Sequence, residues 1–249
     1  SKGPASESSW LLSEPHGPLM SAARAMRLAV KPHGVLGTVL STSGALRKVA
    51  AEPAPGLPLL DPAGLHHIRN GPKGAGGASC RIYKWLRIAE HAAFPDPIKA
   101  AIQAPLQAKL HFYGLKACLH VVGPDFSGRD GCTRDEALGE LSEAYGAVLR
   151  EFAKSRLGGL RMLPVSGGIF AGRFAPELPV LTSTALRRAF DALPDDAQHV
   201  VSVARLEMCI FKEDELAAYV EAFKDDLGRA AEFADSLEMG STPKLGTYM

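Results

Sequence analysis

The feature that most constrains the fold of this chain is the alternation of short apolar runs with helix-like periods over residues 116–227. Apolar runs at 116–122 and 160–165 are each followed by a segment whose apolar residues recur at helical spacing. We interpret 199–211 as a third strand and 213–227 as a closing helix. Because parallel strands need a crossover, and helical crossovers are right-handed, this order predicts a largely parallel central sheet with helices on both faces.

The segment that follows the first of these strands has the clearest helical pattern in the sequence. Thr133 stands three residues before Glu136, which is the spacing of a capping box at a helix start. The pattern predicts a helix over 134–152, and a further helix is expected at 176–193. The predicted buried face of the first helix consists of Leu138, Leu141, Tyr145, Val148, Leu149 and Phe152.

The pattern is less regular before residue 116. We expect a strand at 106–115, a helix at 79–92 and a short strand at 64–68. A proline-rich segment precedes them, and we expect no regular central strand there, because proline lacks the backbone N–H that a sheet uses. Its prolines are Pro53, Pro55, Pro58 and Pro62.

Composition limits the class of protein and of partner. Lys plus Arg (28) nearly equals Asp plus Glu (27), so the charge gives no strong signal for nucleic-acid binding. No window reaches the roughly 18 apolar residues of a membrane span, so we expect a soluble protein with no membrane partner. The cysteines form no C-x-x-C pair, which favours reduced thiols in an intracellular compartment, cytoplasmic or nuclear. They are Cys80, Cys118, Cys132 and Cys209.

The sequence also suggests domain limits. We expect one domain over 20–239, between tails at 1–19 and 240–249 that are rich in Ser, Gly, Pro and Thr. Residues 21–51 are basic and contain no acid. That stretch is open to two interpretations, an organelle transit segment or the ordinary start of the folded domain.

Two glycine-rich loops are the best candidates for a binding site. Residues 163–172, LPVSGGIFAG, follow a predicted strand, and residues 69–79, RNGPKGAGGAS, precede a predicted helix. Adjacent glycines such as Gly167 and Gly168 allow a sharp turn and a close approach of backbone amides to phosphate oxygens. Loops at the carboxyl ends of parallel strands are the usual ligand site of an open α/β sheet. Each loop is also explicable as a plain tight turn.

Three segments in this order resemble the macrodomain family: CLHVVGP at 118–124, the helix at 134–152, and LPVSGGIFAG at 163–172. The resemblance covers roughly residues 65–225. It implies a three-layer α/β/α fold with a central mixed, largely parallel sheet. It also implies binding of ADP-ribose or of an ADP-ribosylated protein, and in some members hydrolysis of ADP-ribosyl esters or related phosphates.

The resemblance also implies which residues bind the ligand. Asn70 matches an asparagine that lies near the distal ribose in the family, and an amide both donates to and accepts from vicinal hydroxyls. As an alternative, Asn70 simply caps a turn. The aromatic that matches the ribose contact is Phe170. The full set of predicted ligand-binding residues is Asn70, Gly76, Gly77, Ser166, Gly167, Gly168, Ile169 and Phe170.

The chain departs from the family pattern at several positions. His67 stands where the first asparagine is expected, and Ala78 interrupts the glycine run. Cys80 falls at the place of the acid that orients water in the hydrolytic members, so that acid is missing. Neither Glu52 nor Asp61 can be aligned securely with the acid that recognises adenine.

Other candidate chemistry is weaker. Cys80 and His120 are a possible thiol and base, but we expect both to be core or wall residues. His66 and His67 lack a second ligand pair, and we predict no metal site and no cofactor.

The resulting hypothesis is a module that binds ADP-ribose or a related nucleotide diphosphate as a reader of ADP-ribosylation. If it is an enzyme, we expect an ADP-ribosyl or ADP-ribose-phosphate hydrolase whose catalytic residues are unknown. The alternative is a degenerate scaffold without nucleotide binding that serves as a protein or RNA interaction module. The oligomeric state is left open.

Overall fold

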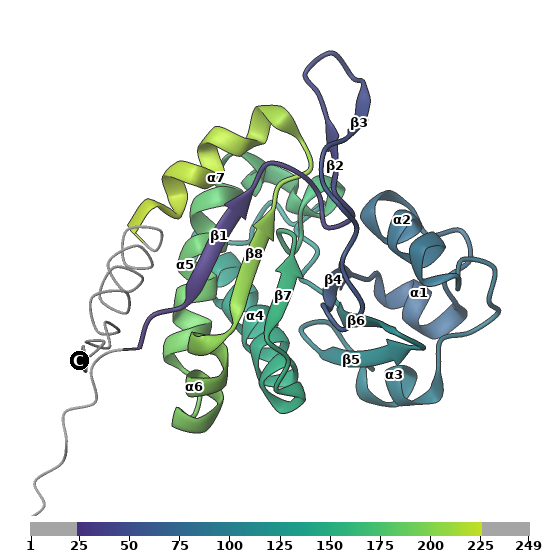
Figure 1. Cartoon of the computed structure of the whole chain (residues 1–249). Coiled ribbons are helices and arrows are strands. Elements are labelled where there is room, and N and C mark those ends of the chain that lie inside the picture. The colour runs from purple at the N-terminus through teal and green to yellow at the C-terminus, as the bar shows by residue number, and fades with distance from the viewer. Residues whose placement is uncertain (1–23, 226–249) are drawn as a thin grey trace, which may run out of the picture.

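The protein is described here by a computed structural model, which places residues 24–225 (Figure 1). The predicted tails, 1–19 and 240–249, lie outside the described residues, as do both ends of the expected domain 20–239. The core is a six-stranded sheet in which only one edge strand is antiparallel. In spatial order its strands are β1 (Arg27–Lys31), β8 (Arg205–Cys209), β7 (Gly159–Met162), β4 (Leu59–Pro62), β6 (Lys116–Val121) and the antiparallel β5 (Ala108–Tyr113).

Helices cover both faces of this sheet. One face packs against the helices α4 (Arg134–Ser155), α5 (Leu178–Asp191), α6 (Asp195–Val203) and α7 (Leu216–Ala222). The other face packs against α1 (Leu65–Asn70), α2 (Gly77–Leu86) and α3 (Asp96–Ala101). The predicted three-layer α/β/α fold with a mixed, largely parallel sheet is therefore confirmed (Figure 1).

A small hairpin stands apart from the main sheet. Its strands are β2 (Thr38–Leu40) and β3 (Leu46–Lys48), and it lies beyond the end of β1 (Figure 1). A 3-10 helix, η2 (Glu213–Glu215), follows β8 on the same side, and Arg47 of the hairpin forms an ion pair with Glu213 at 3.3 Å. Residues 24–51, one of whose interpretations was a transit segment, thus include β1 and this hairpin.

The capping box of α4 is formed as its sequence predicts. Thr133 Oγ1 accepts from the Glu136 backbone N–H at 3.2 Å, and the Glu136 carboxylate accepts from the Thr133 backbone N–H at 2.7 Å. Two backbone groups at the helix start are satisfied in this way. The apolar face of α4 predicted from periodicity is fully or almost fully buried: Leu138, Leu141, Tyr145, Val148, Leu149 and Phe152.

The proline-rich segment contains a central strand, so our expectation there was wrong. β4 lies between β7 and β6, and its residues Leu59 and Leu60 are completely buried. The strand has only four residues, begins directly after Pro58 and ends with Pro62, so the prolines stand at its limits rather than at its middle. The carbonyl of Pro58 still accepts a hydrogen bond, from the Arg161 backbone N–H at 3.0 Å.

Two other predicted strands are wholly or partly helical. Residues 64–68, expected as a strand, form most of α1, and residues 199–203, expected as the start of a strand, are the last turns of α6. Periodicity cannot separate a short apolar strand from a buried helical turn. Pro194 before α6 and the acids Asp195 and Asp196 in its first turn are the helix-start signals that decide the second case.

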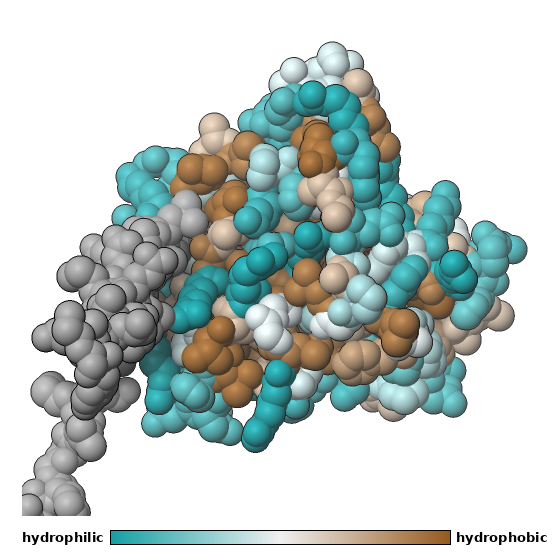
Figure 2. Space-filling view, viewed as in Figure 1, coloured by the Kyte–Doolittle hydropathy of each residue, from teal (hydrophilic) through white to brown (hydrophobic). Residues whose placement is uncertain are grey.

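The surface is mixed in character. Figure 2 shows apolar residues in small groups between polar ones on the face viewed. No helix within residues 24–225 combines the length and the apolar composition needed to cross a bilayer.

Candidate functional site

The glycine-rich loop at 163–172 directly follows β7, whereas the loop at 69–79 is separated from the neighbouring strand β4 by the short helix α1. β7 and β4 are parallel and paired, with Arg161 opposite Leu59, and β6 pairs with the other side of β4. The carboxyl ends of these three parallel strands therefore lie side by side, with about 4.8 Å between neighbouring strands. We call this end of the sheet the carboxyl edge. This edge is the place at which an open α/β sheet binds its ligand.

The start of α2 exposes backbone amides. Gly76 is the residue before the helix, and no described side chain caps this end. The first turn carries no acid. A Cβ on Gly76 or Gly77 would meet no described atom within 4 Å, so the space beside both residues is open. Gly77 has φ +56°, which requires glycine, whereas Gly76 has φ −97° and accommodates any residue.

The loop after β7 forms a second open start. Gly167 precedes η1 (Gly168–Glu177), which consists of two short 3-10 segments on either side of a non-helical Gly172, and again none of the side chains in the described chain caps it. Gly168 has φ +63°, and a Cβ there would have no described neighbour within 4 Å. Ile169 is 81 % exposed at the tip of the loop. Phe170 is half-buried, and its carbonyl accepts from the Phe126 backbone N–H at 2.9 Å.

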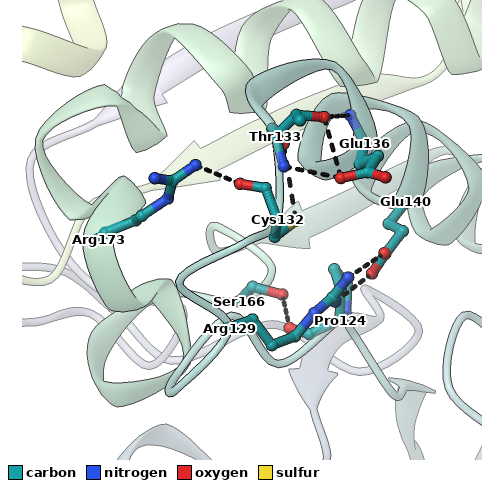
Figure 3. Close-up of polar contacts among 8 residues, drawn as sticks. All are labelled: Pro124, Arg129, Cys132, Thr133, Glu136, Glu140, Ser166 and Arg173. Atoms are coloured by element: carbon teal, nitrogen blue, oxygen red, sulfur yellow. Dashed lines mark hydrogen bonds and ion pairs between the residues drawn. The ribbon is translucent and has the colours of Figure 1, made fainter.

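The loops after β7 and β6 are fixed to each other. Ser166 is 2 % exposed, and its hydroxyl donates to the Pro124 carbonyl (Figure 3). Gly123 is required there, because a Cβ would lie 2.5 Å from Val165 Cγ1. The Val165 backbone N–H donates to the Tyr145 hydroxyl of α4 at 2.9 Å. Of the predicted ligand residues, Ser166 thus uses its side chain to anchor the loop.

The segment after β6 is also tied to η1. Gly172 has φ +49°, and a Cβ there would lie 2.4 Å from the Phe126 carbonyl oxygen. The Arg173 guanidinium donates to the Cys132 carbonyl (Figure 3). Arg129 forms an ion pair with Glu140 of α4 at 2.7 Å. These contacts hold the backbone of the candidate site in a defined shape.

A hollow lies at the same edge of the sheet, beyond the ends of β1 and β8. It encloses about 290 Å³ under the β2–β3 hairpin. In the sheet, β8 is the neighbour of β7 and β1 is the next strand, so the hollow lies one to two strand spacings, or about 5–10 Å, from the end of β7. The lining includes His33, Val39, Arg47, Ile210, Lys212 and Leu216.

Asn70 is less clearly placed for a ligand. It is the last residue of α1 and is exposed. Its Nδ2 donates to the His66 carbonyl at 3.0 Å, one turn back. The contact with a ribose that the family resemblance implies therefore stays a prediction.

Comparison with known proteins gives a clear result for the fold alone. No family model matches the sequence, and no curated protein matches it. A macrodomain structure from Oceanobacillus iheyensis is similar, with a TM-score of 0.51, 15% identity, and coverage of 81% of this chain and 93% of that chain. A Trypanosoma brucei macrodomain is similar with a TM-score of 0.50, 16% identity, and coverage of 78% and 66%.

The chain has a macrodomain-like fold. The Trypanosoma protein has also been solved in complex with ADP-ribose, and that structure matches with a TM-score of 0.48, 16% identity, and coverage of 78% and 68%.

Behind the start of α2 lies a buried polar network that the sequence did not reveal. The Asp61 carboxylate and His120 Nδ1 are 2.7 Å apart, and both side chains are completely buried. Ser79 of α2 donates to the other carboxylate oxygen at 2.6 Å, and Tyr113 Oη lies 2.9 Å from His120 Nε2. The available signal was a polar residue inside each of two apolar strands, since buried polar residues require partners.

The network excludes two of the roles considered for these residues. His120 is a core residue held by Asp61 and Tyr113, as expected, and is not a base exposed to substrate. Asp61 is completely buried, so its carboxylate is not exposed to recognise an adenine base. Burial raises the pKa of the Cys118 thiol well above its usual range, and the Asp61 carboxylate raises it further, so without a bound cation this cysteine is not a nucleophile.

Proposed function

We propose that the edge of the sheet between the loops after β4 and β7 binds ADP-ribose or a related nucleotide diphosphate. The observation that carries this proposal is the pair of open helix starts. Both α2 and η1 begin at glycine, without a capping side chain among the described residues and without an acid in the first turn. The macrodomain-like fold and the resemblance of residues 163–172 to the family's phosphate-binding loop support the same ligand.

The diphosphate would lie between these two starts. The N-terminus of the ten-residue helix α2 carries a partial positive charge and free N–H groups, which favour an anion by about 0.3–1 kcal/mol at an exposed site, and the turn at the start of η1 adds free N–H groups. Gly76, Gly77 and Gly168 leave open space at the backbone, so phosphate oxygens can approach the amides closely. Charge complementarity thus comes from the backbone rather than from a lysine or arginine.

The two ends of the ligand would extend in opposite directions. Phe170 and Ile169 would flank the ribose next to the diphosphate, and Asn70 would bond the distal ribose. The adenine would lie toward the hollow at the ends of β1 and β8. Near that hollow, the Arg81 guanidinium lies 5.2 Å from the centre of the Phe211 ring, a pair that offers a planar surface to a base.

Within this proposal, a reader of ADP-ribosylation is preferred to a hydrolase. Cys80 occupies the place where the resemblance expects the acid that orients water, and a half-buried thiol does not replace a carboxylate in that role. If the chain turns over a substrate, ADP-ribosyl esters or related phosphates are the expected class.

The alternative is a scaffold without nucleotide binding that serves as a protein or RNA interaction module. The interrupted glycine run at Ala78 favours it. So does Asp61, which is buried in the core instead of facing a base.

Calorimetric titration with ADP-ribose, with ADP and AMP as competitors, tests the proposal. We expect saturable binding that Gly76→Ala weakens about tenfold, equivalent to about 1.4 kcal/mol. This variant has an unstrained backbone and no described neighbour to clash with, so its melting temperature should stay the same. The added Cβ blocks only the approach of the phosphate.

Gly139→Ala is the matched control. Gly139 lies on the exposed side of α4, also with no described neighbour within 4 Å of a Cβ. It should leave ADP-ribose affinity unchanged and raise stability slightly, by about 0.5–1 kcal/mol. Absence of wild-type binding at millimolar ligand would refute the proposal and favour the scaffold.

A further inference from the structure

Three metal-ligating side chains of different chemistry meet in the core behind the start of α2. They are Asp61 on β4 and Cys118 and His120 on β6, and within the described part of the chain their ligand atoms all lie within 4.8 Å of one another. All three side chains are completely buried. We propose that Asp61, Cys118 and His120 bind a Zn²⁺ ion, independently of any ligand at the glycine loops.

The sheet register produces this convergence. Asp61 is opposite His120 in the β4–β6 pair, and Cys118 precedes His120 by two residues, so all three side chains point to the same face. Because the ligands come from two strands that are far apart in the sequence, no metal-binding spacing is visible in the chain. Our sequence-based prediction of no metal site considered only the spacing of ligands along the chain.

The distances are close to those of a tetrahedral zinc site. His120 Nδ1 lies 2.7 Å from the Asp61 oxygen and 3.9 Å from Cys118 Sγ. With bonds of about 2.0–2.1 Å to nitrogen and oxygen and about 2.3 Å to sulfur, a tetrahedron separates these atoms by about 3.3–3.6 Å. Side-chain shifts of less than about 1 Å would therefore admit the ion.

The surroundings hold the ligand atoms in the required orientation. Ser79 donates to the Asp61 oxygen that does not contact His120, and Tyr113 pairs with His120 Nε2. The second carboxylate oxygen contacts Nδ1, and Nδ1 also lies within 3.9 Å of Cys118 Sγ. Hydrogen bonds of this kind, from neighbouring groups to the spare atoms of carboxylate and imidazole, are typical of metal sites.

A second observation points to a group at the centre of the cluster. The Tyr83 hydroxyl is buried and has no hydrogen-bond partner among residues 24–225. The Tyr83 ring centre lies 6.2 Å from that of His120. A buried hydroxyl without a partner therefore belongs to a side chain that packs against one of the three ligands.

Charge and softness select the ion. A carboxylate, a thiolate and a neutral imidazole balance Zn²⁺ completely, and a neutral cluster suits an apolar core. Binding releases the Cys118 thiol proton. The single proton of the neutral His120 imidazole would lie on Nε2, directed at the Tyr113 oxygen, which leaves Nδ1 free to bind the ion. The mixture of sulfur, nitrogen and oxygen favours zinc over Mg²⁺ or Ca²⁺.

The test uses the whole chain, unfolded with chelator and refolded with Zn²⁺ or Co²⁺, because a buried site must take up its metal during folding. We expect close to one ion per chain after gel filtration and, with Co²⁺, a thiolate-to-metal charge-transfer band. Cys118→Ala should lower metal occupancy at least tenfold and abolish the band.

Cys209→Ala is the matched control, since Cys209 is a second completely buried thiol whose replacement removes the same volume. It should retain both the ion and the band. Wild-type protein that refolds without stoichiometric metal would overturn the proposal, and so would a Cys118→Ala variant that keeps the charge-transfer band.

Discussion

The two faces of the central sheet bury different kinds of side chain. On the face covered by α4 and α5, neighbouring strands β4 and β6 place Leu60 opposite Leu119. One residue further along, on the face covered by α2, the same strands place Asp61 opposite His120. Both pairs are completely buried. The first gains from removal of apolar surface from water, whereas the second is tolerable only because its members satisfy each other.

The polar face is also the face that serves the candidate site. Ser79 lies in the first turn of α2 and donates to Asp61, so the network fastens the helix start that begins at Gly76 to the central strand. A second ion pair on this face joins Arg161 of β7 to Glu207 of β8 at 2.7 Å. This sheet therefore relies on apolar packing for most of its stability and on buried polar pairs to position backbone near the candidate site.

The largest expected effect is the interaction energy between paired residues, which should be greater for the buried polar pair than for the buried leucine pair. Asp61→Ala and His120→Ala should each destabilise the fold by about 3–5 kcal/mol, because each leaves an unpaired buried polar partner. The double variant should cost about 2 kcal/mol less than the sum, since neither partner is then left alone. Urea unfolding in the presence of chelator measures these free energies.

The matched cycle uses Leu60→Ala and Leu119→Ala. Each should cost about 2–5 kcal/mol from lost burial and a residual cavity, and their coupling should stay below about 1 kcal/mol. Equal coupling energies for the two cycles would break the distinction between the faces.

An intermediate effect is expected at Glu207, whose side chain bonds both Arg161 and Arg205. Burial raises its pKa, but the two guanidinium groups outweigh burial, and the net pKa is lowered. Stability from this carboxylate is therefore present above the ordinary Glu pKa of about 4.3 and is lost as pH falls through the lowered value. Glu207→Gln should cost about 1.5–3 kcal/mol at neutral pH and remove this part of the acid dependence.

Thermal unfolding between pH 7 and acid checks this prediction. Glu177→Gln is the surface control, because Glu177 pairs with Arg134 at 2.9 Å while both side chains are about half exposed. Its cost should stay below about 1 kcal/mol. If Glu207→Gln and the wild type lose stability in parallel as pH falls, the buried pair does not contribute as proposed.

The smallest effect concerns the helix starts on the two faces. Thr133→Ala removes the cap of α4 and should cost about 1 kcal/mol. Gly76→Ala at the uncapped start of α2 should cost almost nothing, as argued above. A loss of stability at Gly76 similar to that at Thr133 would mean that the start of α2 depends on its glycine for folding rather than for access. Differential scanning calorimetry of both variants decides this.

Much of the apolar face could be predicted from the sequence, because its signals are local. The capping box and the helical period of 134–152 involve residues three or four apart, and both are confirmed. The glycine loop at 163–172 follows strand β7 as predicted, and the loop at 69–79 precedes helix α2 as predicted, but it follows helix α1 instead of the expected strand. The central strand β4 could not be predicted, because its burial comes from β6 and β7, which lie 54 or more residues later in the chain.

The sequence by itself thus determined the fold class, the start of α4 and the location of the two glycine-rich loops along the chain. Only the tertiary structure decided that Asp61 and His120 are partners, that Cys118 and Tyr83 lie beside them, and that Ser79 links this group to α2. The physical reason is range. Caps and periods depend on neighbours along the chain, whereas the pairing of buried polar groups depends on strand register, which is fixed only when the sheet assembles.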